Sequence, residues 1–367
     1  MKITLVISSI SGGGAERVLV LLAKGFIDRG YDVTVITLSD KTTDFYQLPV
    51  GCSRMALGIM GSSSSLSEAI KNNIQRICVL RKAVQSSSPD VVISFLRITN
   101  ITTILALIGT KFPLIVTEHI DVKALSYGRF WETLRRLTYP FCSLVVSVSK
   151  GVDEGFATLA KSKRAVIYNP IMINDDGQAD QLPTEVDPNK HWLVSMGRLT
   201  EQKGFDLLLQ AFQQIAPKYP DWQLLILGRG ELREQLERMR DDLGLSGQVI
   251  FTGALRNPFA VLKKAQLFVM ASRNEGFPMA HGEALACGLP VIATDCPSGP
   301  SEMIRHNVDG ILIKNEDINS LAHAIEELIS DETKRKNLSA RAPEVSDRFG
   351  LEKVVKMWEE LLIELIN

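Results

Sequence analysis

The sequence predicts an α/β protein of two domains, each a parallel β-sheet flanked by helices. At 367 residues the chain is long for a single domain and suits two of ordinary size. Short apolar runs alternate with amphipathic segments through both halves, which is the pattern of βαβ units. Several joints between a strand and the following helix are glycine-rich or polar, and open α/β sheets bind ligands at such joints. We therefore expect binding residues at strand ends in both halves.

The composition is that of a soluble globular protein, with 45% hydrophobic and 23% charged residues. No apolar run approaches the roughly 20 residues of a membrane-spanning helix. The apolar start of the chain is too short, and too soon followed by glycines, for a signal peptide. The five cysteines form no CxxC pair, which indicates free thiols in a reducing compartment and no metal cage. These features predict a cytoplasmic protein.

Charge is distributed unevenly along the chain. Residues 1–170 hold 20 Lys and Arg against 12 Asp and Glu, a net charge of +8, whereas the rest of the chain holds 21 against 30, a net charge of −9. Such an asymmetry indicates that the first half faces a polyanion or an anionic membrane surface. Ordinary drift of surface charge remains the alternative.

The first strand, residues 2–9, runs into the glycine-rich segment S-G-G-G-A-E at residues 11–16. A helical apolar spacing follows as far as Gly30, and residues 31–38 form the next strand of a β-α-β unit. Gly13 and Gly14 would let the backbone approach a diphosphate or a sugar ring closely. The segment is not the dinucleotide fingerprint GxGxxG, and a plain tight turn explains it equally well.

Further strands of the first sheet are predicted at residues 90–95, 112–117, 144–148 and 165–168. His119 stands just after the second of these strands, at the edge where ligands bind. A lone histidine is more often structural, but this position favours contact with a ligand. No other histidine is close in sequence, so a metal site is not expected.

Two basic segments lie in the first half. An amphipathic helix after the serine-rich loop at 62–67 carries Lys71, Arg76 and Arg81 on and around its polar side. Residues 127–143 combine aromatic rings with Arg129, Arg135 and Arg136. Both segments suit lipid head groups or a pyrophosphate. A solvated helix face and a core helix with its aromatic rings inward are the alternatives.

The second domain follows a linker at residues 174–190. Its first strand, 191–196, leads into G-R-L-T-E-Q-K-G at 197–204, which places Arg198 and Lys203 at the sheet edge. Fixed cations there would stabilise the negative charge that develops when a sugar–phosphate bond breaks. Surface ion pairing is the alternative.

The segment S-R-N-E-G-F-P-M-A-H-G-E-A-L-A-C-G-L-P at 272–290 joins two apolar runs through a loop and a short helix. Pro278 suits the helix start, and Gly288 suits its end. The helix N-terminus favours an anion. Glu275 and Glu283 would accept hydrogen bonds from hydroxyl groups. Together they suggest a nucleotide-sugar, whereas two solvated glutamates are the alternative.

The pattern E-G-F-P-x4-E-A-x-A-x-G-x-P-V-I-A-T, which begins at Glu275, resembles the signature of glycosyltransferase family 4, retaining enzymes of the GT-B fold. G-R-L-x-x-x-K-G at 197–204, G-P-x-E at 299–302 and G-G-x-E at 13–16 are similar to further motifs of that family. Along most of its length the chain resembles the branch with bacterial N-acetylgalactosaminyltransferases that extend polyprenyl-pyrophosphate-linked glycans.

The resemblance implies two Rossmann-like domains that face a donor cleft, namely residues 1–170 on the acceptor and membrane side and residues 171–345 on the nucleotide-sugar side. Residues 346–367 would form a helix that crosses back to the first domain. The implied catalytic residues are His119 near the reacting centre, Arg198 and Lys203 at the diphosphate, and Glu275 at the sugar hydroxyls. The implied donor-binding residues are Gly13, Gly14, Leu255, Phe277, Pro278, Met279, Ala280 and Glu283, the last of these at the ribose. Glu16 would join Lys71, Arg76, Arg81, Arg129, Arg135 and Arg136 on the acceptor and membrane side.

The implied reaction is the retaining transfer of a hexose or N-acetylhexosamine from a UDP-sugar to a polyprenyl-pyrophosphate-linked saccharide. The protein would work on the inner face of the cytoplasmic membrane, without nucleic acid. The chain has no DxD motif, and Arg198 and Lys203 can replace a divalent ion, so no metal is expected. A GDP-sugar donor, a soluble acceptor, a UDP-sugar 2-epimerase and a non-catalytic sugar-nucleotide binder remain alternatives.

One departure from the family pattern is His281-Gly282, where apolar residues are usual. Glycine inside a helix costs roughly 1 kcal/mol relative to alanine. We therefore expect that the missing side chain makes room for a donor substituent such as an N-acetyl group.

Overall fold

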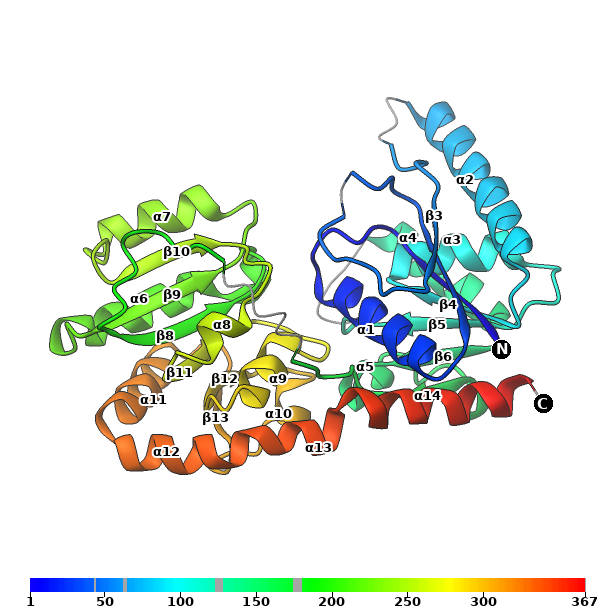
Figure 1. Ribbon diagram of the computed structural model, residues 1–367. Helices are drawn as coiled ribbons and strands as arrows, with labels where there is room; N and C mark the ends of the chain where they lie inside the picture. The colour runs from blue at the N-terminus through cyan, green and yellow to red at the C-terminus, as the bar shows by residue number, and fades with distance from the viewer. Residues whose placement is uncertain (43, 62–64, 123–127, 174–179, 367) are drawn as a thin grey trace. The chain divides into compact units, whose positions relative to one another are not determined.

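The computed structural model describes residues 1–42, 44–61, 65–122, 128–173 and 180–366, and it divides the chain into two compact units (Figure 1). The first unit comprises residues 1–170 and 351–367, and the second comprises residues 171–350. The predicted serine-rich loop, the predicted linker and the start of the segment 127–143 lie partly outside the described residues. No helix in the described part of the chain is long and apolar enough to cross a membrane.

The first unit is built on a sheet of seven strands in the order β3-β2-β1-β4-β5-β6-β7, with every pairing parallel. Its central strands are fully buried runs of Val, Ile and Leu, as a parallel sheet covered on both faces requires. The strands are β1 (Lys2–Ile7), β2 (Asp32–Thr37), β3 (Ser53–Ala56), β4 (Val91–Phe95), β5 (Leu114–Glu118), β6 (Leu144–Ser147) and β7 (Arg164–Val166).

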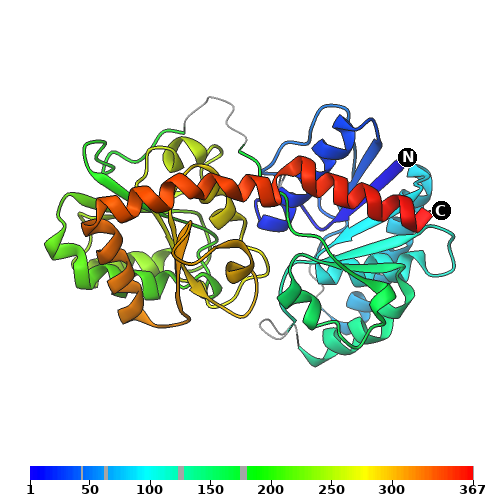
Figure 2. The ribbon, with the colours of Figure 1, turned by 90° about the horizontal axis from the view of Figure 1, so that it is seen from below.

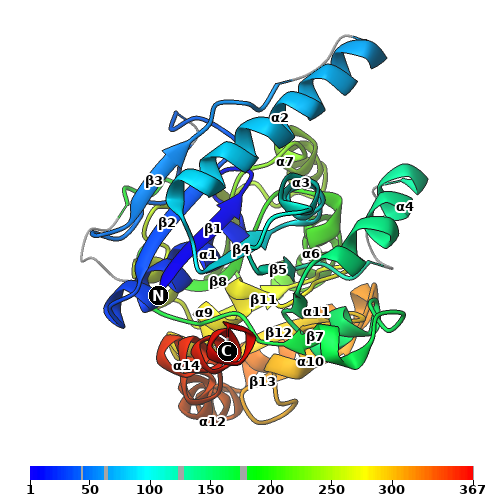
Figure 3. The same ribbon diagram turned by 90° about the vertical axis from the view of Figure 1, so that its right-hand side faces the viewer.

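Helices cover both faces of this sheet. α2 (Leu66–Ser87), α3 (Arg97–Leu107) and α4 (Arg129–Thr138) lie on one face, with α3 between the other two (Figure 3). α1 (Gly14–Asp28) lies on the opposite face, and the last helix, α14 (Leu351–Ile366), packs beside it (Figure 2). Gly25 allows this contact, because a Cβ there would lie 2.3 Å from Val355. The remaining short elements are α5 (Lys150–Glu154) and the 3₁₀ turns η1 (Tyr139–Phe141) and η2 (Lys161–Lys163).

The second unit has a parallel sheet of six strands in the order β10-β9-β8-β11-β12-β13. The strands are β8 (His191–Met196), β9 (Trp222–Leu227), β10 (Val249–Gly253), β11 (Leu267–Met270), β12 (Val291–Asp295) and β13 (Gly310–Lys314). The helices are α6 (Phe205–Ile215), α7 (Arg233–Asp242), α8 (Phe259–Leu262), α9 (Met279–Ala286), α10 (Pro300–Met303), α11 (Ile318–Ser330), α12 (Glu332–Arg341) and α13 (Val345–Phe349), with 3₁₀ turns η3 (Glu201–Lys203), η4 (Ala216–Lys218) and η5 (Ala342–Glu344).

The predicted α/β class with two parallel sheets is confirmed. Two local features were not predicted. The edge strand β3 is short and only half-buried, so it lacks the apolar run that marks the other strands. The predicted amphipathic helix is present as α2, but Ile70 and Ile74 on its apolar side are 62% and 57% exposed.

Candidate active site

Two loops at the carboxyl edge of the second sheet bring Lys203 and Glu275 together. The loop after β8 passes through η3 into α6, and the loop after β11 leads into α9. Gly204 has a φ of 62°, and a Cβ on it would lie 2.0 Å from the carbonyl oxygen of Ala271. Because glycine permits this close approach, Lys203 Nζ donates a hydrogen bond to Glu275 Oε1 at 2.5 Å.

The carboxylate of Glu275 is ionised and almost fully buried, with a relative exposure of 6%. The Ser272 hydroxyl donates to its Oε1 at 2.7 Å. Burial acts to raise the pKa of Glu275, but the Lys203 ammonium outweighs it, with His281 and the hydrogen bonds from Lys203 and Ser272 contributing, so the pKa lies below its ordinary value. A charged carboxylate accepts hydrogen bonds only, so Glu275 is suited to bind the hydroxyl groups of a sugar.

Three hydroxyl residues that were not predicted hold the Glu275 loop in place. Ser272 donates to Glu275, as described above. Thr294 Oγ1 donates to the carbonyl of Ser272 at 2.5 Å, and Ser298 Oγ donates to the carbonyl of Glu275 at 2.5 Å. All three stand at or just after the end of β11 or β12, which is the sequence signal that could have identified them.

Arg273 braces the same loop from its other side, and it too was not predicted. Its guanidinium donates to both carboxylate oxygens of Asp206 at 2.9 and 2.7 Å, and to Glu316 at 3.0 Å. Its backbone amide donates to the carbonyl of Gln202 at 2.8 Å, and its carbonyl accepts from Asn315 Nδ2 at 3.0 Å. The Glu275 loop is therefore tied to η3, to α6 and to the turn before α11.

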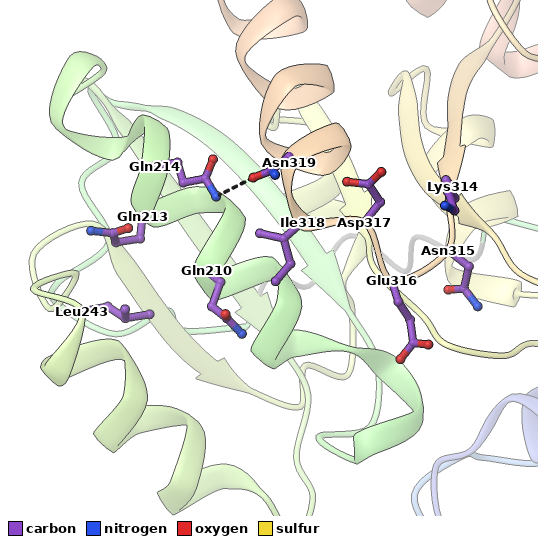
Figure 4. Close-up of a pocket in the computed structure, with 10 residues that line it drawn as sticks. All are labelled: Gln210, Gln213, Gln214, Leu243, Lys314, Asn315, Glu316, Asp317, Ile318 and Asn319. Atoms are coloured by element: carbon purple, nitrogen blue, oxygen red, sulfur yellow. Dashed lines mark hydrogen bonds between the residues drawn. The ribbon is translucent and has the colours of Figure 1, made fainter.

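An open groove of about 600 Å³ lies between α6, the residue that follows α7 and the turn into α11 (Figure 4). Its lining is dominated by amide and carboxylate side chains, and Gln214 donates to Asn319 across it at 3.3 Å. The lining residues are Gln210, Gln213, Gln214, Leu243, Lys314, Asn315, Glu316, Asp317, Ile318 and Asn319. Asn315 and Glu316 also contact Arg273, so the groove lies behind the Glu275 loop, and the predicted site residues do not line it.

The predicted donor-binding residues around α9 are mostly buried. Phe277 packs edge-on against Phe349, with 5.1 Å between ring centroids. Pro278, the predicted helix start, is the N-cap residue of α9, and the helix begins one position later, at Met279. Ala280 is half-buried. Glu283 is 3% exposed, so its carboxylate lies within the fold.

Gly282 has a packing role that differs from the one expected. A Cβ on this residue would lie 2.4 Å from Cδ1 of Ile171, in the same unit. The space predicted for an N-acetyl substituent is therefore filled by a side chain of the protein.

His281, in α9, is fully buried and packs edge-on against Phe268, with 5.8 Å between ring centroids. Neither ring nitrogen has a hydrogen-bond partner among the described residues. Burial lowers the pKa of His281 to about 4, although the nearby Glu275 carboxylate acts to raise it. The imidazole is therefore neutral at physiological pH.

This buried histidine should make the second unit less stable in acid. The ordinary pKa of histidine is about 6.5, so between that value and about 4 the unfolded chain binds more protons than the folded chain. The contribution of His281 is constant above this window and is lost as the pH falls through it, by roughly 1.4 kcal/mol per pH unit. His281→Leu should flatten this part of the pH profile of urea unfolding midpoints. The matched change of the exposed His191 to Leu should not, and an unaltered slope in His281→Leu would contradict the assignment.

Two other predicted residues of the second unit lie at the same sheet edge. Arg198 is exposed just after β8, and Leu255 is half-buried in the turn after β10. The structure therefore places Arg198, Leu255, Lys203 and Glu275 after the carboxyl ends of three strands of one sheet, β8, β10 and β11, at the edge where open sheets bind ligands.

His119 lies at the carboxyl edge of the first sheet, directly after β5. Its ring stacks on Phe95, with 5.7 Å between ring centroids, and its Nε2 lies 3.0 Å from Thr117 Oγ1. Removal from water lowers the pKa of His119 to about 4. The ring is therefore neutral at physiological pH and can exchange hydrogen bonds with a polar ligand.

The glycine-rich loop after β1 leads directly into α1. Gly13 is the extended N-cap residue of α1, and Gly14 is the first residue of that helix. The left-handed residue is Gly12. Glu16 is only 6% exposed, so the structure places it inside the first unit and not on an acceptor surface.

The predicted basic residues of the first unit fall into two groups. Lys71, Arg129 and Arg136 are exposed. The others contact the protein itself. Arg76 donates to the carbonyls of Ile59 and Gly61, and Arg81 donates to that of Ile108. Arg135 is 6% exposed and is paired with Glu132, so its expected place on the membrane side is wrong.

Comparisons with known proteins identify the family of the chain. The family model described as Glycosyltransferase Family 4 matches residues 12–174, and the model described as Glycosyl transferases group 1 matches residues 179–345. An alpha-1,4-N-acetyl-D-galactosaminyltransferase of Campylobacter jejuni, named for the substrate GalNAc-alpha-(1->4)-GalNAc-alpha-(1->3)-diNAcBac-PP-undecaprenol, is 30% identical over 100% of this chain and 99% of its own. The amylovoran biosynthesis glycosyltransferase AmsD of Erwinia amylovora is 26% identical over 98% of this chain and 99% of its own.

Solved structures share the same fold. Anabaena HepE in complex with UDP superposes with a TM-score of 0.77 at 22% identity, over 99% of this chain and 100% of HepE. Sucrose-phosphate synthase of Thermosynechococcus elongatus superposes with a TM-score of 0.82 at 18% identity, over 100% of this chain and 99% of that one. These likenesses show the GT-B fold. The full-length Campylobacter relative, together with the two family models, shows that this chain belongs to glycosyltransferase family 4 and is a sugar-transferring enzyme.

Proposed function

We propose that this enzyme transfers a hexose or an N-acetylhexosamine from a UDP-sugar to a saccharide linked to polyprenyl pyrophosphate, with retention of the anomeric configuration. The observation that carries the proposal is the buried Lys203–Glu275 pair at the carboxyl edge of the second sheet. It places an anion-binding cation beside a carboxylate that can accept from sugar hydroxyls. The Campylobacter relatives, which are named for undecaprenol-linked substrates, and HepE, which was crystallised with UDP, support the choice of acceptor and nucleotide.

The residues of the second unit would bind the donor as follows. Arg198 and Lys203 would lie at the diphosphate, where negative charge grows as the bond between the anomeric carbon and the β-phosphate oxygen breaks. Glu275 would accept hydrogen bonds from sugar hydroxyls and Glu283 from the ribose, with the base near Leu255. The first turn of α9, Met279 and Ala280, would add backbone amides to the phosphates.

The residues of the first unit would contact the other side of the substrates. His119 is neutral, so it would hydrogen-bond to the donor sugar as an uncharged group. Gly13 and Gly14 would admit the donor close to the backbone at the start of α1. The acceptor hydroxyl would attack the anomeric carbon on the face that the diphosphate leaves, and its proton would pass to a donor phosphate oxygen.

We further propose that the enzyme works without a divalent metal, at the cytoplasmic face of an anionic membrane, and without nucleic acid. The positive side chains Arg198 and Lys203 can fulfil the charge role that a metal has in other transferases. The lipid-linked substrates in the relatives' names and the net positive charge of residues 1–170 support work at a membrane surface.

The test is the release of nucleotide from a panel of UDP- and GDP-sugars, in EDTA, with and without a polyprenyl-pyrophosphate-linked saccharide. We expect release of UDP from one donor, only when the lipid-linked acceptor is present, and formation of an α-linked product from an α-linked donor. Nucleotide release that does not depend on the lipid-linked acceptor would point to a soluble acceptor or to hydrolysis. Conversion of the donor sugar without an acceptor would favour an epimerase, and activity that vanishes in EDTA would overturn metal independence.

A further inference from the structure

α4 and the η1 turn that follows it present a row of exposed apolar side chains. Phe130, Leu137 and Phe141 are 70%, 65% and 68% exposed. Phe130 and Leu137, seven positions apart, lie on one side of α4, and Phe141 follows in η1. Across the described residues, the exposed large hydrophobic side chains all belong to the first unit. A solvent-exposed row of large apolar side chains is typical of a surface that binds a membrane, a protein or a ligand.

The charges beside this row indicate which partner it fits. Arg129 and Arg136 are exposed on the same helix. Glu132, which is the only acidic residue of α4, points inward. Apolar rings with arginines and without carboxylates match the boundary of a bilayer that contains anionic lipids. Residues 1–170 carry a net charge of +8, so the first half of the chain as a whole is also complementary to anionic lipids.

The inner face of α4 has the opposite chemistry, a group of buried ion pairs. Glu132 accepts from Arg97 Nη1 at 2.8 Å and from Arg135 Nε and Nη2 at 3.1 and 3.0 Å. Arg97 and Arg135 are only 3% and 6% exposed. The guanidinium of Arg135 also lies 5.0 Å from the centroid of the Phe156 ring. α4 is thus held to the first unit by charge pairs that are largely shielded from water.

These ion pairs continue to the end of β5, where His119 follows. Arg97 Nη2 lies 3.7 Å from Glu118 Oε2, and the Tyr139 hydroxyl, just beyond α4, donates to Glu118 Oε1. Leu96, directly before Arg97, has a φ of 71°, which is strained for a residue with a side chain. Buried ion pairs often add little to stability compared with apolar packing, so a role in positioning explains them better.

We propose that α4 is a two-faced docking helix. Its outer face, formed by Phe130, Leu137, Phe141, Arg129 and Arg136, docks on an anionic bilayer. Its inner face, through Glu132, Arg97 and Glu118, fixes the strand end that carries His119, so Glu132 is a positioning residue. The inference rests on the proposed lipid-linked acceptor for its biological sense, but the docking test uses neither sugar nor acceptor, so its failure is distinct from failure of the proposed function.

The outer face is tested by co-sedimentation of the whole protein with phosphatidylglycerol vesicles and with phosphatidylcholine vesicles. Wild type should bind the anionic vesicles and release them at high salt. Phe130→Ser with Leu137→Ser should weaken this binding by at least tenfold, and Arg129→Ala or Arg136→Ala by about fivefold each. The control Ile363→Ser, on the exposed part of α14, should bind as wild type does. Equal binding of all variants to the anionic vesicles would overturn the docking surface. So would a result in which the substitutions reduce self-association of the protein and leave vesicle binding unchanged.

The inner face is tested with Glu132→Gln, read by the NMR signal of the His119 ring and by steady-state kinetics. We expect a shifted His119 signal and a kcat lowered by about tenfold, with the KM for the acceptor unchanged, whereas a change that only loosened the fold would alter both. Glu132→Asp keeps the charge and should have a kcat between those of Glu132→Gln and wild type. If Glu132→Gln does not fold, the kcat and the His119 signal of Glu132→Asp test the positioning role instead. Asp28→Asn, in an exposed pair on α1, is the matched control. A folded Glu132→Gln with the wild-type signal and kcat would overturn the positioning role.

Discussion

Replacing Lys203 by alanine should slow sugar transfer by about 10²- to 10³-fold, the usual effect of removing one preorganised electrostatic group. Lys203 Nζ lies 2.5 Å from Glu275 Oε1, so its charge is fixed before any ligand binds. Breaking the sugar–phosphate bond increases the negative charge on the diphosphate, and a fixed cation stabilises that state without reorganisation. The measurement is the single-turnover rate at saturating UDP-sugar and acceptor. A rate close to that of wild type would remove Lys203 from the leaving-group role.

The same substitution should also destabilise the second unit, and the two effects can be separated. Without Lys203, the Glu275 carboxylate stays buried with no cation, and removal of one partner of a buried ion pair costs about 3–5 kcal/mol. Lys203→Ala combined with Glu275→Gln removes the lone charge and should recover most of this stability, but not the rate. Lys218→Ala is the matched control, since Lys218 pairs with Glu326 on the surface and is 64% exposed. It should change neither quantity.

The alternation of apolar runs and amphipathic segments was sufficient to predict the fold, because a buried parallel strand needs a continuous apolar run. β4 and β6 are buried along their whole length and were predicted with little error. The edge strand β3 has no such run and was missed. α2 shows the reverse case, since its apolar residues Ile70 and Ile74 follow a helical pattern but lie in solvent. A pattern gives the side of a helix that is apolar, but not what covers it.

The sequence predicts where the residues of the candidate active site lie along the chain, but not the hydrogen bonds between them. Strand ends pointed to His119, Lys203 and Glu275, since ligands bind at the carboxyl edge of a parallel sheet. The hydrogen bond between Lys203 and Glu275 joins residues 72 positions apart, and no local pattern encodes it. Arg135 was placed on the wrong side of α4, because a helix with basic and aromatic residues all round gives no unique inward face. The ion pairs of Glu132 with Arg97 and Arg135 decide the orientation.

Substituting Gly204 by alanine should unfold the second unit, or greatly lower both its stability and the rate of sugar transfer. Its φ of 62° is a left-handed conformation, which costs an ordinary residue about 1–2 kcal/mol. In addition, the new Cβ would lie 2.0 Å from the carbonyl oxygen of Ala271, and a backbone atom at the end of β11 cannot yield cheaply. Any shift that relieves this contact separates η3 from the loop that carries Glu275. We therefore expect a loss of stability of several kcal/mol and, wherever the variant is still folded, a rate as low as that of Lys203→Ala.

Gly244 provides the control that separates the two causes. It too is left-handed, with a φ of 71°, but a Cβ on it would meet no atom within 4 Å. Gly244→Ala should therefore lose only the conformational term, about 1–2 kcal/mol, and keep the wild-type rate. Urea unfolding and single-turnover rates of both variants give the comparison. If Gly204→Ala behaves like Gly244→Ala, the close approach of the two loops does not hold Lys203 against Glu275. If Gly204→Ala alone loses both stability and rate, the missing side chain at Gly204 is what brings the charges of Lys203 and Glu275 together.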